Sequence, residues 1–176
     1  EVSLDINEFS EILYMATQDA RVIRKKVSEN IVQNPNLYTN SVFTCNEIYL
    51  YINNVSNIPP GIYHYDMKSH GLNHLNNLPD KSAGYYCYGQ PEIENANCII
   101  FISANYHKYM WRYNHERAYR NLLIDVAQLA QSFLLAATNL QKKTFLTPAL
   151  RDSELVKLFD LEEYIEDIRY LVAIGN

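Results

Sequence analysis

Residues 109–120 (YMWRYNHERAYR) bring together side chains that can carry chemistry. The stretch holds the only tryptophan of the chain, three arginines, three tyrosines and His115, the histidine of most interest. Arg112 and Tyr113 are adjacent, and a cation beside a phenol stabilises the phenolate, lowers the pKa of the tyrosine and suits it to act as a general base. The alternative is a structural clamp in which arginine stacks on the tryptophan and tyrosine rings.

A second basic group precedes this stretch. Arg21, Arg24 and Lys25 stand at spacings i, i+3 and i+4, so in a helix they share one face and could hold an anion such as a phosphate. The alternative is an ordinary solvated basic end of a helix. The spacing of the serines, histidines and aspartates predicts no catalytic triad.

The cysteines predict neither a metal site nor a disulfide framework. Cys87, Cys98 and His107 fit no standard zinc spacing, so we expect no metal. Three widely spaced cysteines without a CxxC motif are typical of reduced thiols, which favours a cytoplasmic protein.

Composition excludes several classes of function. The 176 residues carry a formal net charge of −5, which argues against binding to duplex nucleic acid. With only 5 glycines, the chain has no glycine-rich phosphate or nucleotide loop. The longest strongly apolar stretch, residues 133–137, is far too short to span a bilayer, so we expect no membrane partner.

The first two thirds of the chain predict a helix followed by a sheet. Residues 5–18 have an apolar stripe at helical spacing behind a capping-box pattern, Asp5 with Glu8. Three strands are expected over residues 47–52, 61–66 and 72–75, forming an antiparallel meander. Residues 97–104 are apolar on both faces and indicate a buried central strand.

The strongest predicted element is a helix over residues 116–140, which contains no glycine or proline. Its second half is apolar almost all round, so it must be buried on every side, within its own domain or against a partner such as a second subunit. An extended piece over 143–147, a short helix over 152–159 and a strand over 168–174 follow. The order predicts one α+β domain over residues 1–176, with a mixed or antiparallel sheet flanked by helices.

Four segments together resemble a known family. They are FSEILYMATQ (9–18), NEIYLYI with PPGIYHYD (46–52 and 59–66), MWRYNHERAYR running into the long helix (110–140), and LRDSELVKLFDL with YLVAIG (150–161 and 170–175). In this order they are similar to the nitroreductase superfamily, in the branch of FMN-dependent dehydrogenases that form thiazoles and oxazoles in ribosomally made peptides.

The resemblance implies a fold, a partner and a reaction. It implies an FMN-binding α+β domain that forms a homodimer, or a heterodimer with a paralogue, through the long helix. It also implies oxidation of an azoline in a peptide to an azole, with the proton passing to a base and the hydride to flavin N5. Arg112 and Tyr113 stand where that branch has a lysine–tyrosine pair; arginine cannot shuttle a proton, but it can hold a phenolate.

The resemblance also assigns flavin contacts. It implies that Arg21 and Arg24 hold the phosphate, that Asn40 and Ser41 hydrogen-bond the ring or ribityl chain, and that the backbone near Thr147 passes close to N5. The sequence departs from the family at three places where a flavin lies against backbone. Tyr38–Ser41 replaces a Pro-Ser-Ala/Gly-Gly stretch, Ala127 and Gln128 replace glycine and histidine, and Leu140–Lys142 replaces a Gly-Leu-Gly exit.

Two main hypotheses remain open from the sequence. The first is an FMN oxidoreductase of the azoline dehydrogenase type. The second is a flavin-free, non-catalytic subunit that keeps the fold and serves as a scaffold or docking partner in a peptide-modifying complex. A general nitro- or quinone-reducing enzyme is less favoured by the peptide-branch motifs.

Overall fold

The computed structural model describes residues 2–33 and 45–176, without the side chains of residues 26–33, 111 and 112. Six strands form one sheet in the order β3-β2-β1-β4-β6-β5. Their bounds are β1 Ile48–Ile52, β2 Gly61–Asp66, β3 Gly71–Asn76, β4 Cys98–Asn105, β5 Lys143–Thr147 and β6 Glu166–Gly175. The helices are α1 Ile6–Ala16, α2 Gln18–Gln33, the 3₁₀ turn η1 Ala83–Cys87, α3 Pro91–Glu94, α4 Tyr106–Arg112, α5 Arg117–Asn139 and α6 Asp152–Leu158.

Every pair of neighbouring strands in this sheet is antiparallel. The sequence left open a mixed or an antiparallel sheet, and the described part of the chain settles this as antiparallel. An isolated parallel bridge between Leu4 and Val55 lies outside the named strands. The predicted α+β class and the β1–β2–β3 meander are confirmed.

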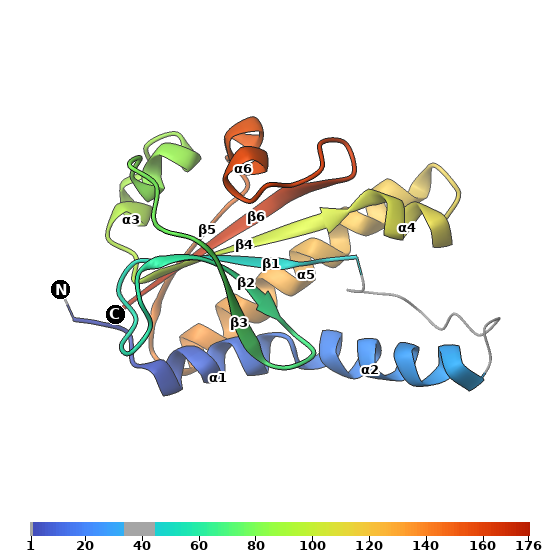
Figure 1. Ribbon diagram of the computed structural model, residues 1–176, viewed down its shortest axis with the longest axis horizontal. Coiled ribbons are helices and arrows are strands. Elements are labelled where there is room, and N and C mark those ends of the chain that lie inside the picture. Colours follow the sequence, from blue (N-terminus) through green and yellow to red (C-terminus); the bar gives the residue numbers. More distant parts are fainter. Residues whose placement is uncertain (1, 34–44) are drawn as a thin grey trace.

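Helices cover both faces of the sheet (Figure 1). Helices α1 and α5 lie on one face, and α3, α6 and η1 lie on the other. Each strand contributes side chains to the cores on both faces of the sheet, because successive side chains point to opposite faces. In β1, Ile48 and Leu50 join the core under α1 and α5, whereas Tyr49 and Tyr51 join the core under α6. All eight residues of β4 are buried, as a central strand with two covered faces requires.

The first helix begins where the sequence predicts. The Asp5 side chain accepts hydrogen bonds from the backbone N–H groups of Asn7 and Glu8, so it caps the helix. Glu8 does not complete the capping box, because its carboxylate pairs with Lys142 Nζ at 2.7 Å. That ion pair joins the start of α1 to the segment that follows α5.

The long helix buries one face only. Leu122, Val126 and Phe133 lie in the core, whereas Ile124 and Leu135 on the opposite face are 49% and 62% exposed. The expectation that α5 is buried on every side is therefore not met within this chain. Gln128 and Gln131 are exposed between these two apolar side chains, so the outer side of α5 is mixed in polarity.

The length and composition of helix α5 bear on the expected absence of a membrane partner, which stays a prediction. Among the described residues α5 is the one helix that is long and apolar enough to cross a bilayer by length and composition. The sequence argument considered only the short stretch at residues 133–137 and missed this. The core helix of a water-exposed domain satisfies the same criterion, and α5 packs one face against the sheet.

Two helices were not foreseen. Helix α2 continues almost directly from α1 through a polar stretch with no clear apolar stripe. Residues 109–112 belong to α4, a separate helix, and not to the start of the long one. Helix α4 begins at Asn105, whose side chain accepts the N–H of Lys108 at 3.0 Å, and ends at Tyr113. This short helix sets the position of the chemistry-bearing segment.

The cysteines are buried free thiols, as predicted. Within residues 2–33 and 45–176, no three His, Cys, Asp or Glu side chains come together in a way that could hold a metal ion. The His64 side chain is only 26% exposed and pairs with Glu47. The cytoplasmic location stays a prediction.

His70 makes the fold sensitive to acid. Its ring nitrogens hydrogen-bond the hydroxyls of Tyr65 at 2.7 Å and Ser10 at 2.9 Å, which ties the β2–β3 turn to α1. Burial and the charge of Arg21 lower the pKa of His70 below its ordinary 6.5, so the fold favours the neutral ring. Its contribution to stability is therefore complete above pH 6.5 and is lost as the pH falls below that value.

We accordingly expect the free energy of unfolding to fall between pH 7 and pH 5 by up to about 1 kcal/mol from this group. Urea titrations at several pH values measure it. Asparagine tolerates the left-handed backbone of this position (φ 52°), so a His70→Asn variant is a suitable test. In this variant the free energy of unfolding should fall less between pH 7 and pH 5. An unchanged slope in the variant would assign the effect to other groups.

Candidate functional site

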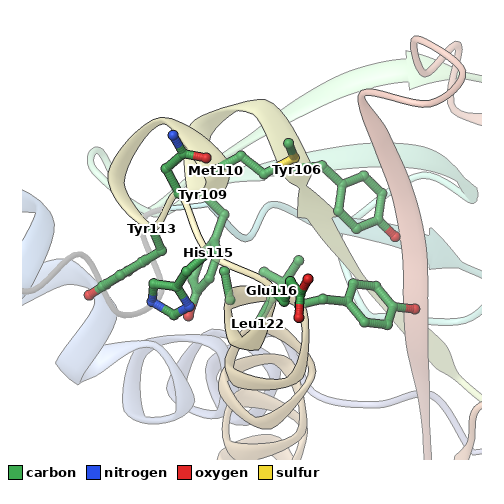
Figure 2. A pocket seen from close by; sticks show the side chains of 10 residues that line it. Tyr106, Tyr109, Met110, Tyr113, His115, Glu116 and Leu122 are labelled. Carbon is green, nitrogen blue, oxygen red and sulfur yellow. The ribbon is translucent and has the colours of Figure 1, made fainter.

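A pocket of about 490 Å³ opens where α4 meets the start of α5 (Figure 2). Helix α4 forms one wall and the first turns of α5 form the other. The lining residues are Tyr106, Tyr109, Met110, Tyr113, Asn114, His115, Glu116, Ala118, Tyr119 and Leu122. The pocket thus combines aromatic walls with hydroxyl, imidazole, amide and carboxylate groups at its edges, and its volume suits a small ring system or a few peptide side chains.

The tyrosines of this pocket are held in place by packing and by one carboxylate. The rings of Tyr109 and Tyr113 lie 4.9 Å apart between centroids. The Tyr109 hydroxyl donates to Asp125 Oδ2 at 3.4 Å. Burial and the nearby Asp125 charge raise the pKa of Tyr109, and burial raises the pKa of Asp125. Tyr109 is therefore a neutral hydrogen-bonding group, unsuited to act as a phenolate base.

A second set of contacts anchors α4 to the sheet. The Tyr106 hydroxyl donates to Asp167 Oδ1 at 2.8 Å and also contacts the guanidinium of Arg169, which pairs with Asp167. Burial and the Asp167 carboxylate raise the pKa of Tyr106. Because Tyr106 is fixed to β6, the pocket wall formed by α4 has a fixed position.

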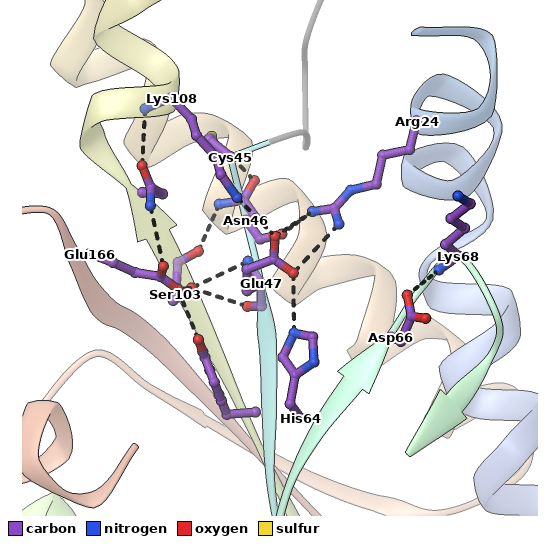
Figure 3. A network of polar contacts seen from close by, with 12 residues as sticks. Arg24, Cys45, Asn46, Glu47, His64, Asp66, Lys68, Ser103, Lys108 and Glu166 are labelled. Atoms are coloured by element: carbon purple, nitrogen blue, oxygen red, sulfur yellow. Dashed lines mark hydrogen bonds and ion pairs between the residues drawn. The ribbon is translucent and has the colours of Figure 1, made fainter. Parts of the chain in front are cut away.

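Three basic side chains surround one carboxylate (Figure 3). Glu47, just before β1, contacts Arg24 of α2 at 3.5 Å, Lys108 of α4 at 3.4 Å and His64 of β2 at 3.3 Å. Arg24 also donates to the carbonyl of Asn46. We call Glu47, Arg24, His64 and Lys108 the Glu47 cluster.

The cluster keeps Glu47 ionised at all ordinary pH values. Burial alone would raise the pKa of Glu47, but the hydrogen bond with His64 and the charges of Arg24 and Lys108 outweigh burial and lower that pKa to about 2. The Glu47 side chain is 16% exposed, so these contacts lie largely out of bulk solvent. Glu47 is thus a permanent negative charge held among cations.

A second carboxylate, Glu166 of β6, lies on the other side of β4 from Glu47. Glu166 accepts from the hydroxyls of Ser103 and Tyr49 and from the side-chain amide of Asn105. Ser103 Oγ in turn accepts the backbone N–H of Glu47 at 3.2 Å. The two carboxylates are therefore linked through the end of β4, which fixes where β1 begins and where α4 starts.

The structure separates the predicted site residues into three places. Tyr113 lines the pocket, and Arg112 ends α4, with its side chain outside the described part. Arg24 belongs to the Glu47 cluster. Arg21 stacks on the Tyr14 ring, 3.4 Å from its centroid, and donates to the Tyr14 carbonyl.

An arginine also lies against a tyrosine at Tyr14. Hydrogen bonding to Arg21 and its charge lower the pKa of the half-exposed Tyr14. The predicted pairing of Arg112 with Tyr113 stays a prediction, because the Arg112 side chain lies outside the described part. Arg21 and Arg24 therefore face different partners and do not converge on one anion.

The remaining predicted residues lie apart from the pocket or outside the description. Thr147 ends β5 at the sheet edge, where its hydroxyl accepts the N–H of Ala149 at 3.1 Å, and it does not line the pocket. Asn40 and Ser41 lie outside the described residues. Lys25 is exposed, and His115 lines the pocket rim.

The described residues do not fit an FMN phosphate at the predicted position. Arg24 already holds the ionised Glu47, so a phosphate there would sit beside a like charge. Arg21 is engaged with Tyr14. All five glycines, at 61, 71, 84, 89 and 175, lie away from the pocket lining, so no backbone there offers the close approach that a flat ring uses.

Sequence reasoning missed Glu47, the centre of the polar site. Its three partners stand 17 to 61 residues away along the chain, so no local spacing marks them. A charged residue directly before a fully buried strand was the one available signal. The contact of Asp125 with Tyr109 was also missed, because the sequence around Asp125 looks like an ordinary polar position of a long helix.

Comparison with known proteins places this chain in a family. A model of the nitroreductase family matches residues 24–176. The trifolitoxin operon protein TfxC of Rhizobium leguminosarum bv. trifolii is 32% identical over 180 residues, covering 98% of this chain and 50% of TfxC. The chain thus spans about half the length of this curated relative.

Solved structures of two other proteins have the same fold as this chain. A proposed nitroreductase from Anabaena variabilis superposes with a TM-score of 0.78 at 20% identity, covering 99% of this chain and 34% of that one. A chain of the E. coli microcin synthetase McbBCD complex, with truncated pro-MccB17 bound, superposes with a TM-score of 0.75 at 17% identity, covering 100% and 65%. The family match over residues 24–176, with a relative above 30% identity, shows that this chain belongs to the nitroreductase family.

Proposed function

We propose that this chain is a peptide-binding subunit of a peptide-modifying complex and that it works without a flavin of its own. The observation that carries the proposal is the tyrosine-lined pocket between α4 and α5. Two relatives support the setting, since one comes from a trifolitoxin operon and the other is part of a microcin synthetase with a truncated pro-peptide bound.

The make-up of the pocket suits a peptide. Tyrosine rings supply large contact area at low cost in conformational entropy, and their hydroxyls hydrogen-bond backbone amides. The pocket contains four of them, and His115, Asn114 and Glu116 add polar groups at the edge. A planar azoline or azole ring would stack on the tyrosine faces, and the flanking peptide would meet the polar edge.

Two features favour the flavin-free form. The cations expected to hold the phosphate are engaged with Glu47 and Tyr14, and Ala127 and Gln128 stand where the family often has glycine and histidine. Two exposed apolar side chains of α5, Ile124 and Leu135, are compatible with a partner subunit. That partner is a second copy or an active paralogue.

The second candidate is an azoline dehydrogenase that binds FMN. One observation favours it: Tyr113, the predicted base, lines the pocket in which a peptide ring would lie. In that case the flavin would have to be held by groups other than Arg21 and the Glu47 cluster.

Flavin content separates the two candidates. We expect the purified protein to be colourless and to gain no FMN after incubation with an excess and gel filtration, with visible absorbance as the readout. Circular dichroism shows that the sample is folded. Near-stoichiometric FMN in a folded sample would overturn the flavin-free proposal and favour the dehydrogenase.

A further inference from the structure

The Glu47 cluster has the composition of an anion-binding site. Its basic side chains come from three separate elements: Arg24 from α2, Lys108 from α4 and His64 from β2. Elements so far apart in sequence meet at one point, and the group at that point is a carboxylate. Arginine and lysine converging on one oxyanion are the usual means by which proteins hold phosphate.

The charges show what Glu47 does there. Arg24 and Lys108 contribute two positive charges, and Glu47 cancels one of them. If the Glu47 carboxylate were removed, the Arg24, Lys108 and His64 side chains would surround the space that its oxygens had filled. At about 4 Å a like charge costs about as much as an unlike charge gains, so an ionised Glu47 opposes a phosphate as strongly as one of the cations attracts it.

The cluster can be reached from solvent. The Lys108 side chain is 55% exposed, and those of Arg24 and His64 are 23% and 26% exposed. A phosphate group could therefore approach without unfolding any element. What prevents it from binding is charge and occupancy.

We infer that Glu47 is a built-in occupant of an anion site and that it determines specificity by excluding phosphate-bearing ligands. Replacing Glu47 with a neutral residue of the same shape opens the site to a phosphate group. The inference concerns the Glu47 cluster alone and does not depend on peptide binding in the tyrosine pocket.

The test is the binding of inorganic phosphate to Glu47→Gln, measured by isothermal titration calorimetry and by the shift in melting temperature. We expect the variant to bind phosphate at least about tenfold more tightly than the wild-type protein, since removal of one like charge strengthens the attraction. Its melting temperature should rise with phosphate concentration, because a ligand of the folded state stabilises it.

Two matched variants act as controls. Glu47→Asp keeps the charge and should bind phosphate no better than the wild type. Glu166→Gln removes a neighbouring carboxylate that accepts hydrogen bonds from two hydroxyls and an amide, and it should also gain nothing. A gain in Glu166→Gln as large as in Glu47→Gln would overturn the inference, because it would show a general effect of charge.

A comparison of FMN with riboflavin shows whether the phosphate group is what the opened site binds. Riboflavin has the same ring without the phosphate, so Glu47→Gln should bind FMN and not riboflavin, and the double variant Glu47→Gln/Arg24→Gln should bind neither. If Glu47→Gln is unfolded in plain buffer, recovery of its far-ultraviolet circular dichroism in phosphate supports the inference, and failure to recover overturns it. A folded Glu47→Gln protein that does not bind phosphate overturns it as well.

Discussion

Replacing Phe133 with alanine should lower the free energy of unfolding by about 3–5 kcal/mol, the usual cost of deleting a buried aromatic ring. Phe133 is completely buried in the middle of α5, in the core that α1 and α5 form with the sheet. The cost has two parts, the lost transfer of the ring out of water and the cavity left behind. For a chain of this size the loss corresponds to a drop in melting temperature of about 10 °C.

The matched control lies two residues along the same helix. Leu135 is 62% exposed, so Leu135→Ala should change the free energy of unfolding of the isolated chain by less than about 0.5 kcal/mol. Urea unfolding followed by circular dichroism measures both variants. Equal effects would show that the two faces of α5 are not distinguished as described, whereas a loss of self-association in Leu135→Ala alone would assign that face to a partner subunit.

The sheet was well predicted because its signals are local. The boundaries of β2 coincide with the predicted residues 61–66, and β1 starts one residue later than predicted. Alternation and β-branched or aromatic residues mark such strands directly. The long helix was also found within about one residue at each end, since 23 residues without glycine or proline leave few alternatives.

The helices that position the site gave weaker signals. The break between α4 and α5 occurs at Tyr113, with φ −115° and ψ 80°, and no glycine or proline marks it. Helix α2 has a mean composition too polar to show a buried stripe. Both elements are held by tertiary contacts, such as Tyr106 with Asp167 and Arg24 with Glu47, which no local pattern encodes.

The chemistry-bearing segment was easier to find from the sequence than the partners of the α2 arginines. Its composition singles out the residues around Tyr113, and they line the pocket. The contacts of Arg21 with Tyr14 and of Arg24 with Glu47 were not predicted. Spacing along a helix predicts which side chains share a face. Their partners depend on which element packs against that face, and the local sequence does not encode this.

These pairings connect the two proposals. Helix α4 carries Lys108 toward Glu47 and, one residue later, Tyr109 toward Asp125 at the pocket. The same short helix thus closes the anion cluster on one side and builds the aromatic wall on the other. Neutralising Glu47 should open the first site and leave the tyrosine wall in place, so phosphate binding and peptide binding can be measured independently.

Peptide binding should depend strongly on the Tyr113 ring. In Tyr113→Ala we expect the Kd for a fluorescently labelled peptide carrying one thiazoline ring to rise by about tenfold to thirtyfold, the usual effect of truncating a central aromatic contact. The half-buried ring packs on Tyr109 at 4.9 Å, so truncation removes the face on which the azoline stacks and loosens its neighbour. Fluorescence anisotropy measures the affinity, and thermal melts show that the variant remains folded.

Two tyrosine variants sharpen this test. Tyr164→Ala truncates a tyrosine that is 85% exposed and outside the pocket lining, so it should leave the Kd unchanged. Tyr113→Phe keeps the stacking face and loses only the hydroxyl, so its Kd should rise by no more than about twofold to tenfold, the net value of one hydrogen bond. Equal losses in Tyr113→Ala and Tyr164→Ala would place the peptide elsewhere. If the protein is found to carry FMN and to oxidise the peptide, the same variant tests the catalytic base. Loss of turnover in Tyr113→Phe with normal peptide binding would support the Tyr113 hydroxyl as the base, and unaffected turnover would exclude it.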